Sequence, residues 1–237
     1  MANPVLDEKT FIKQEQIAGD VVTVEGCVNK TIILSFIVLG GAMISWTYAY
    51  TFSGLLMVMA ILGFATAMFT IWKPQYSNIS APLYAVFEGL FLGAISFLFN
   101  SMFPGIVMQA VMLTLGVLFL MLFLYKSRII KVTAGLRAGI IMATGAIALV
   151  YIITLVLGLF GISIPYIHSN GWIGIGFSVV VVGIASFNLL LDFDFFEKGS
   201  ASGAPKYMEW YAAFGLMVTL IWLYLEILRL LAKLRSR

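Results

Sequence analysis

Cysteine and histidine are almost missing from this chain of 237 residues, which has one of each, Cys27 and His168. A single cysteine excludes an internal disulfide and a four-cysteine metal site. His168 lies in a predicted loop, where a solvated side chain is a simpler interpretation than a metal ligand or a pH switch. Neither residue type therefore indicates a resident cofactor or metal.

Charged residues are also scarce, at 11% of the chain, whereas hydrophobic residues make up 62%. The mean hydropathy is +1.04. Apolar stretches recur at the length of about 20 residues that a helix needs to cross the hydrocarbon core of a bilayer. The chain is therefore expected to be an integral membrane protein in contact with membrane lipid. Its net charge of +3 comes without a stripe of basic and aromatic residues, so no nucleic-acid partner is expected.

Seven stretches are long and apolar enough to span a membrane. Their continuous hydrophobicity favours helices over barrel strands, which are about ten residues long and alternate in polarity. The sequence predicts an all-α, polytopic bundle of seven transmembrane helices formed by residues 31–237, after a polar cytosolic segment at residues 1–30. The spans are expected at residues 31–50, 52–72, 82–102, 105–125, 138–160, 171–195 and 209–232.

Helix breakers are sparse within these spans. Each of the six prolines falls in the N-terminal segment, in a loop or at a helix start, so no span is expected to need a proline kink. Glycine occurs inside the spans instead, as in "GLFLG" at 89–93 and "GWIGIG" at 171–176. Small residues let helix backbones approach closely in lipid, so we interpret both motifs as packing seams.

Lysine and arginine occupy alternate loops, all on the side of the N-terminal segment. These loop cations are Lys73, Lys126, Arg128, Lys131, Arg137, Lys198 and Lys206. The distribution follows the positive-inside rule and predicts a cytoplasmic N-terminus. Seven spans would then place the C-terminus outside, in conflict with the four cations of "RLLAKLRSR" at 229–237. A re-entrant segment that returns the C-terminus to the inside is the alternative.

Six of the eleven acidic residues lie in or beside the spans. An ionisable group within a span costs about 2.5–3.5 kcal/mol on insertion scales, so a retained one indicates a functional site with a partner. The six are Glu88, Asp192, Asp194, Glu197, Glu209 and Glu226.

Asp192 and Asp194 close the sixth span, in "LLLDFDFFEKG". Residues two apart are separated by about 200° around a helix, so these two carboxylates face different ways. Asp194 has Lys198 four residues later, which predicts an ion pair on the helix surface. Asp192 has Asn188 four residues earlier, so these two oxygen-bearing side chains are expected together on an inward face of the helix.

The remaining acids have simpler local interpretations. Glu88 is expected about 9 Å into the membrane from the inner surface, either as a functional carboxylate or as a neutral carboxyl bonded to a neighbouring helix. Glu209 suits the N-terminus of the last helix, where a negative charge is stabilised. Glu226 has Arg229 three residues later, which predicts a local ion pair. A role for this pair as an outer gate is the alternative.

Three longer motifs resemble a known family. They are "YAVFEGLFLG" at 84–93, "NLLLDFDFFEKG" at 188–199 and "YAAFGLMVTLIWLYLEILRLL" at 211–231. Together they resemble the transmembrane Bax inhibitor-1 family, and "VVTVEGCVNKT" at 21–31, with Ser45 and Trp46, is similar to its bacterial branch. The resemblance implies a seven-helix bundle whose last helix is enclosed by the others, a bacterial plasma-membrane location and a pH-sensitive calcium leak.

The family typically has one aspartate near the end of the sixth helix and a second within the seventh. The first aligns with Asp192, so the resemblance implies a pore role for this residue. An ungapped match from Ala212 to Arg229 puts Thr219 at the second position, whereas a match to "LYLE" alone would put Glu226 there. We prefer the longer match, and threonine does not titrate, so the chain departs from the two-aspartate pattern.

We hypothesise that Glu88 replaces the missing aspartate, because it is expected in the same inner half of the membrane as Asp192. Two nearby carboxyl groups can share a proton near neutral pH and so respond to it. Together with Asn188 and Thr219, they would offer the oxygen ligands that a hard cation such as calcium prefers, in a weak and open site. The expected ligand is a permeant calcium ion or another cation.

Two other functions are weighed against transport. An enzyme is not expected, because the sequence has no HExxH or GxSxG motif and no histidine within a span. A non-transporting regulator that binds membrane proteases or other membrane proteins is also compatible with the resemblance. Composition does not separate this alternative from transport.

Overall fold

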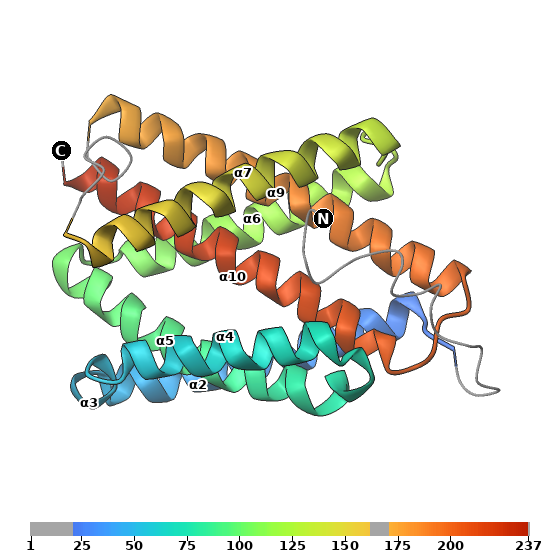
Figure 1. Ribbon diagram of the computed structural model, residues 1–237, viewed down its shortest axis with the longest axis horizontal. Coiled ribbons are helices and arrows are strands. Elements are labelled where there is room, and N and C mark those ends of the chain that lie inside the picture. The colour runs from blue at the N-terminus through green and yellow to red at the C-terminus, as the bar shows by residue number, and fades with distance from the viewer. Residues whose placement is uncertain (1–20, 162–170, 237) are drawn as a thin grey trace. The chain divides into compact units, whose positions relative to one another are not determined.

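The computed structural model describes residues 21–161 and 171–236 (Figure 1). Most of the predicted N-terminal segment, and His168, lie outside these described residues. Within them the chain is helical, apart from an isolated β-bridge between Val21 and Pro205 and the connecting turns. The elements are α2 (Val24–Thr47), α3 (Ala49–Ser53), α4 (Leu56–Trp72), the 3₁₀ helix η1 (Pro74–Tyr76), α5 (Ser77–Met102), α6 (Ile106–Lys126), α7 (Ala134–Leu159), α9 (Trp172–Ala201) and α10 (Met208–Arg235).

The predicted all-α membrane architecture is confirmed. Six helices of the described chain, α2, α5, α6, α7, α9 and α10, are long and apolar enough to cross a bilayer. The seventh apolar helix, α4, has 17 residues, because the predicted second span is interrupted at Gly54 and Leu55, where α3 ends and α4 begins. Of the six long helices, α10 has the largest buried share, 61% of its most apolar window, in agreement with an enclosed last helix.

Two helix starts differ from the sequence prediction. The first helix begins at Val24 rather than near residue 31, because the Thr23 side chain accepts a hydrogen bond from the backbone N–H of Gly26 and so caps it. The third span begins at Ser77, directly after η1, which puts Pro82 inside α5. The expectation that no span contains an internal proline was therefore wrong for α5. Pro82 is the sixth residue of that helix, and because proline has no backbone N–H, one intrahelical hydrogen bond is lost there.

The described residues form two compact units. One, here called the α2–α5 unit, contains residues 21–104 and 194–218, and the other, the α6–α7 unit, contains residues 105–161, 171–193 and 219–236. Both α9 and α10 therefore contribute residues to each unit. The functional side chains are described below within the unit to which they belong.

In the α2–α5 unit, α5 packs against both α2 and α4 (Figure 1). The "GLFLG" motif forms the contact with α2. A Cβ atom added at Gly89 would lie 2.5 Å from the backbone oxygen of Val38, and one at Gly93 would lie 2.2 Å from that of Ala42. Only glycine allows this approach, so the predicted packing seam is confirmed here.

The second glycine motif behaves differently. At Gly176, in α9, an added Cβ would meet no atom within 4 Å, so this glycine does not mark a close helix contact. The interpretation of Gly176 as part of a packing seam was therefore wrong. The motif contributes instead through the backbone oxygen of Gly174, which accepts a hydrogen bond from Lys233.

Candidate functional site

Asn188 links α9 to α7 in the α6–α7 unit. Its side chain is buried, and its Nδ2 donates to Thr144 Oγ1 at 2.8 Å and to the backbone oxygen of Ile184 at 2.9 Å. These two acceptors fix the orientation of the amide, because the reversed amide would face its oxygen towards the carbonyl oxygen of Ile184. Asn188 Oδ1 is buried, and no described residue donates a hydrogen bond to it.

Asp192 lies one helical turn after Asn188, and its side chain is fully buried. The predicted inward face of α9 is thus occupied by these two oxygen-bearing side chains. Thr219 of α10 belongs to the same unit and is 3% exposed. Asn188, Asp192 and Thr219 are therefore all buried in membrane spans of the α6–α7 unit, where a retained polar side chain is a functional candidate.

Asp194 faces away from this pair and forms the predicted ion pair. Its Oδ2 lies 3.0 Å from Lys198 Nζ, one turn farther along α9. The lysine side chain is 48% exposed, whereas that of Asp194 is 12% exposed. Asp194 is therefore held by its own helix as a structural charge.

Glu88 lies in the α2–α5 unit, roughly three turns from the start of α5. Its carboxylate sits against Gly63 of α4, where an added Cβ would lie 2.7 Å from Glu88 Oε1. The absence of a side chain at Gly63 leaves the space that this carboxylate occupies. Because Asp192 belongs to the other unit, the pairing of Glu88 with Asp192 stays a prediction.

The predicted pair of Glu226 and Arg229 is present in the α6–α7 unit, with 2.8 Å between Glu226 Oε1 and Arg229 Nη1. Tyr151 of α7 completes it. The tyrosine hydroxyl donates to Glu226 Oε1 at 2.8 Å and accepts from Arg229 Nη1 at 3.1 Å, and the guanidinium lies over its ring. Glu226 is 2% exposed, and its Oε2 receives no hydrogen bond from a described residue.

Two further cations near the end of α10 contact other helices. Lys233 is 6% exposed, and its Nζ donates to the Gly174 backbone oxygen at 3.0 Å and to Ser178 Oγ at 2.9 Å, both in α9. Arg235 donates to Gln109 of α6 at 2.9 Å. The sequence does not predict these contacts, because residues in separate spans carry no spacing that marks them as neighbours.

Glu209 has a larger structural role than a helix-end charge. Its Oε1 accepts hydrogen bonds from both the backbone N–H and the hydroxyl of Thr23, and it lies 3.1 Å from Lys206 Nζ. Because Thr23 caps α2, this buried carboxylate joins the start of α2 to the start of α10 within the α2–α5 unit. We assign it to fold stability rather than to ion passage.

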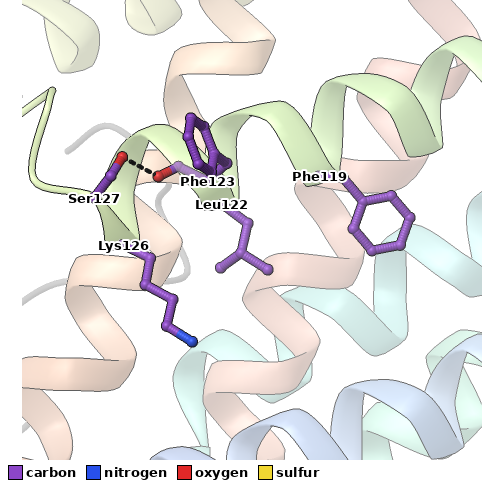
Figure 2. Close-up of a pocket in the computed structure, with 5 residues that line it drawn as sticks. All are labelled: Phe119, Leu122, Phe123, Lys126 and Ser127. Carbon is purple, nitrogen blue, oxygen red and sulfur yellow. Dashed lines mark hydrogen bonds between the residues drawn. The ribbon is translucent and has the colours of Figure 1, made fainter.

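A surface hollow lies at the C-terminal end of α6 (Figure 2). Its lining consists of Phe119, Leu122, Phe123, Lys126 and Ser127, and the Ser127 hydroxyl donates to the backbone oxygen of Phe123. Among the residues that the structure describes, no acidic side chain lines the hollow. It therefore offers no carboxylate ligand for a cation.

Within the described parts of the chain, no cluster of three or more His, Cys, Asp or Glu side chains is suitable for holding a metal ion. The oxygen-bearing groups of the α6–α7 unit include an amide, a hydroxyl and one carboxylate, from Asn188, Thr219 and Asp192. Such a set would bind a hard cation weakly, because calcium affinity rises with the number of charged ligands.

Comparison with known proteins gives one result for almost the whole chain. A family model described as Bax inhibitor 1 like matches residues 3–236. No curated protein and no solved structure matches the chain significantly.

Proposed function

The chain belongs to the Bax inhibitor 1 like family, and from this premise we propose that it is a pH-sensitive leak channel or transporter for calcium and other cations. Its long apolar helices and its family identify it as a multi-pass membrane protein. The proposed pathway passes the buried polar side chains of the α6–α7 unit, and carboxyl groups within the membrane act as its gate.

The observation that carries the proposal is the orientation of Asn188. Both amide hydrogens are used by Thr144 and Ile184, which leaves Oδ1 buried with no donor among the described residues. A buried polar atom is normally satisfied, and an unmet acceptor within a span is therefore a candidate ligand for a cation or for its hydration water. The fully buried Asp192, one turn away, supplies the negative charge that attracts the ion.

Proton control is assigned to Asp192 and Glu88. A protonated carboxyl no longer attracts a cation, so the leak follows the fraction of these groups that is ionised. Two observations support this role for Glu88. It is an acid within a span, and its carboxylate occupies the space that the lack of a side chain at Gly63 leaves. We propose that it supplies the second carboxylate of the gate, which Thr219 does not provide.

The proposed location is a bacterial plasma membrane, with the N-terminus in the cytoplasm. The positions of the loop cations support this orientation, because they lie in the connections after α4, α6 and α9 or in the helix turns beside them, and these connections would share the cytoplasmic face. The connections after α2, α5 and α7 hold no lysine or arginine.

The test is flux through purified protein in liposomes, measured for calcium, potassium and protons from pH 6 to 8. We expect Asp192→Asn and Glu88→Gln to reduce calcium flux and to flatten its pH dependence. Asp194→Asn is the matched control, since its carboxylate is engaged by Lys198, and it should leave both unchanged. If the leak and its pH dependence survive both of the first two changes, the carboxylate gate is wrong.

A second pair of variants tests the role of the Asn188 oxygen. Asn188→Leu and Thr144→Val both break the hydrogen bond between α9 and α7, but only the first removes Oδ1. We expect calcium flux to fall several-fold in Asn188→Leu and to be largely kept in Thr144→Val. Equal losses would show that the hydrogen bond matters and the oxygen does not. No flux in the wild-type protein, with a stably bound membrane protein, would instead support the regulator.

A further inference from the structure

The hollow at the C-terminal end of α6 combines apolar side chains with one cation (Figure 2). Phe119, Leu122, Phe123 and Lys126 follow the spacing i, i+3, i+4 and i+7, which places them on one face of the helix. The hollow has a volume of about 350 Å³, and Figure 2 shows Leu122 and Lys126 extending to the same side of α6. One helix face therefore carries an apolar stripe that ends at a positive charge.

Lys126 supplies the hydrogen-bond donors of this hollow. The phenylalanine and leucine side chains have no polar hydrogen, and the hydroxyl hydrogen of Ser127 is used by the backbone oxygen of Phe123. Within the described chain, no carboxylate forms an ion pair with Lys126. Its ammonium is thus available to an acceptor from outside the protein, and an anionic acceptor would also complement its charge.

The depth of the hollow in the membrane follows from the length of α6. The 21 residues of this helix extend about 31 Å, roughly the thickness of the hydrocarbon core. Lys126 is the last of them, so its ammonium lies at the level of the lipid headgroups, and its stem follows the apolar surface below. Phe119 lies about 10 Å deeper, at the level of the acyl chains.

This face of α6 is open to lipid. Only 17% of the most apolar window of the helix is buried, and Phe119 and Phe123 are 63% and 62% exposed. Acyl chains are as apolar as these side chains and can cover them. They offer nothing to the ammonium of Lys126, however. An occupant that suits the whole hollow has an apolar chain and an anionic head.

We propose that the hollow is a binding site for an anionic phospholipid. The phosphate contacts Lys126, and one acyl chain packs along Phe119, Leu122 and Phe123. A zwitterionic phospholipid has the same phosphate, but its own ammonium group offsets the charge, so the site prefers the anionic lipid. One lysine near a membrane surface contributes about fivefold to such a preference. The site does not depend on the proposed cation leak.

The experiment measures the lipid that stays bound to the purified full chain in detergent. The protein is mixed with equal amounts of phosphatidylglycerol, which is anionic, and phosphatidylcholine, which is zwitterionic, and the bound lipids are identified by native mass spectrometry. We expect the wild type to prefer phosphatidylglycerol. Lys126→Gln should reduce this preference about fivefold, whereas Lys126→Arg, which keeps the charge, should retain it.

The matched control is Lys73→Gln. Lys73 is also an exposed lysine at the C-terminal end of an apolar helix, α4, and the change in charge is the same, but it does not line the hollow. This variant should keep the wild-type preference. Phe119→Ser should lower the amount of bound phosphatidylglycerol with little change in Tm, because this side chain is mostly exposed.

Four results would overturn the proposal. The first is a wild type without preference for the anionic lipid. The second is an equal loss in Lys126→Gln and Lys73→Gln, which would indicate general surface charge. The third is displacement of the lipid by glycerol phosphate, which would indicate a site for a free phosphate group. The fourth is a wild-type dimer that Phe119→Ser dissociates, which would assign this face to a second copy of the chain.

Discussion

The contact between α2 and α5 predicts a large and position-specific effect of a single methyl group. In Gly89→Ala, the added Cβ would lie 2.5 Å from the backbone oxygen of Val38 and 3.0 Å from its Cα. Both atoms belong to the backbone of α2, so no side-chain rotation relieves the overlap. The two helices must move apart, and the packing along their seam must loosen.

The matched control is Gly40→Ala. Gly40 lies on α2 itself, and an added Cβ there would meet no atom within 4 Å. Alanine favours a helix over glycine by up to about 1 kcal/mol, and this gain applies to both variants. Their difference therefore isolates the cost of overpacking, which is about 1–3 kcal/mol.

The assay is thermal unfolding of both purified variants in the same detergent. For a chain of this size, 1 kcal/mol corresponds to about 2–4 °C in Tm, so Gly89→Ala should unfold about 2–12 °C below Gly40→Ala. If the two variants unfold within about 1 °C of one another, the close approach of α2 and α5 does not exist as described.

Two further comparisons concern the carboxylates of the α2–α5 unit. Gly63→Ala should displace the flexible carboxylate of Glu88, 2.7 Å from the added Cβ, and so reduce calcium flux in liposomes with little loss of Tm. Gly116→Ala, where the Cβ meets nothing within 4 Å, should change neither, and equal flux in both variants would contradict a role for Glu88. Thr23→Val and Thr133→Val both remove a helix N-cap, but only the first also breaks hydrogen bonding to a buried carboxylate. Thr23→Val should therefore be less stable by about 1–3 kcal/mol more than Thr133→Val, measured by denaturation in detergent, and equal losses would exclude that contribution.

The helices are predictable because the membrane imposes one requirement on every span. Continuous apolar runs must satisfy their backbone hydrogen bonds internally, so hydropathy locates the helices well. Their ends depend on local chemistry that hydropathy does not include. The Thr23 cap starts α2 among polar residues, and the break at Gly54 shortens α4. Pro82 gave a misleading start for α5, because the helix continues through this proline, which is its sixth residue and lies beyond the first turn.

The candidate site is also only partly predictable from the sequence. Contacts within one helix can be predicted, whereas contacts between helices cannot. The pairs of Asp194 with Lys198 and of Glu226 with Arg229 follow from helical spacing, and both are present. The contact of Tyr151 with Glu226 joins α7 to α10, and a tyrosine in an apolar run gives no sign of such a partner. Spacing within one helix is fixed by its geometry, whereas neighbours between helices depend on how the whole bundle packs.

The α10 contacts also account for the conflict between the C-terminal cations and the positive-inside rule. That rule reflects lysine and arginine side chains in short loops, which stay on the cytoplasmic side when the chain inserts. Arg229 and Lys233 are instead part of α10, where they bond to Tyr151 and to Ser178 of the same unit. Their presence is explained by contacts within the protein, so they need not mark a cytoplasmic end. With these two set apart, only Arg235 and Arg237 of the four C-terminal cations are left to oppose the loop cations, so the conflict with the predicted cytoplasmic N-terminus is smaller than the sequence alone suggests.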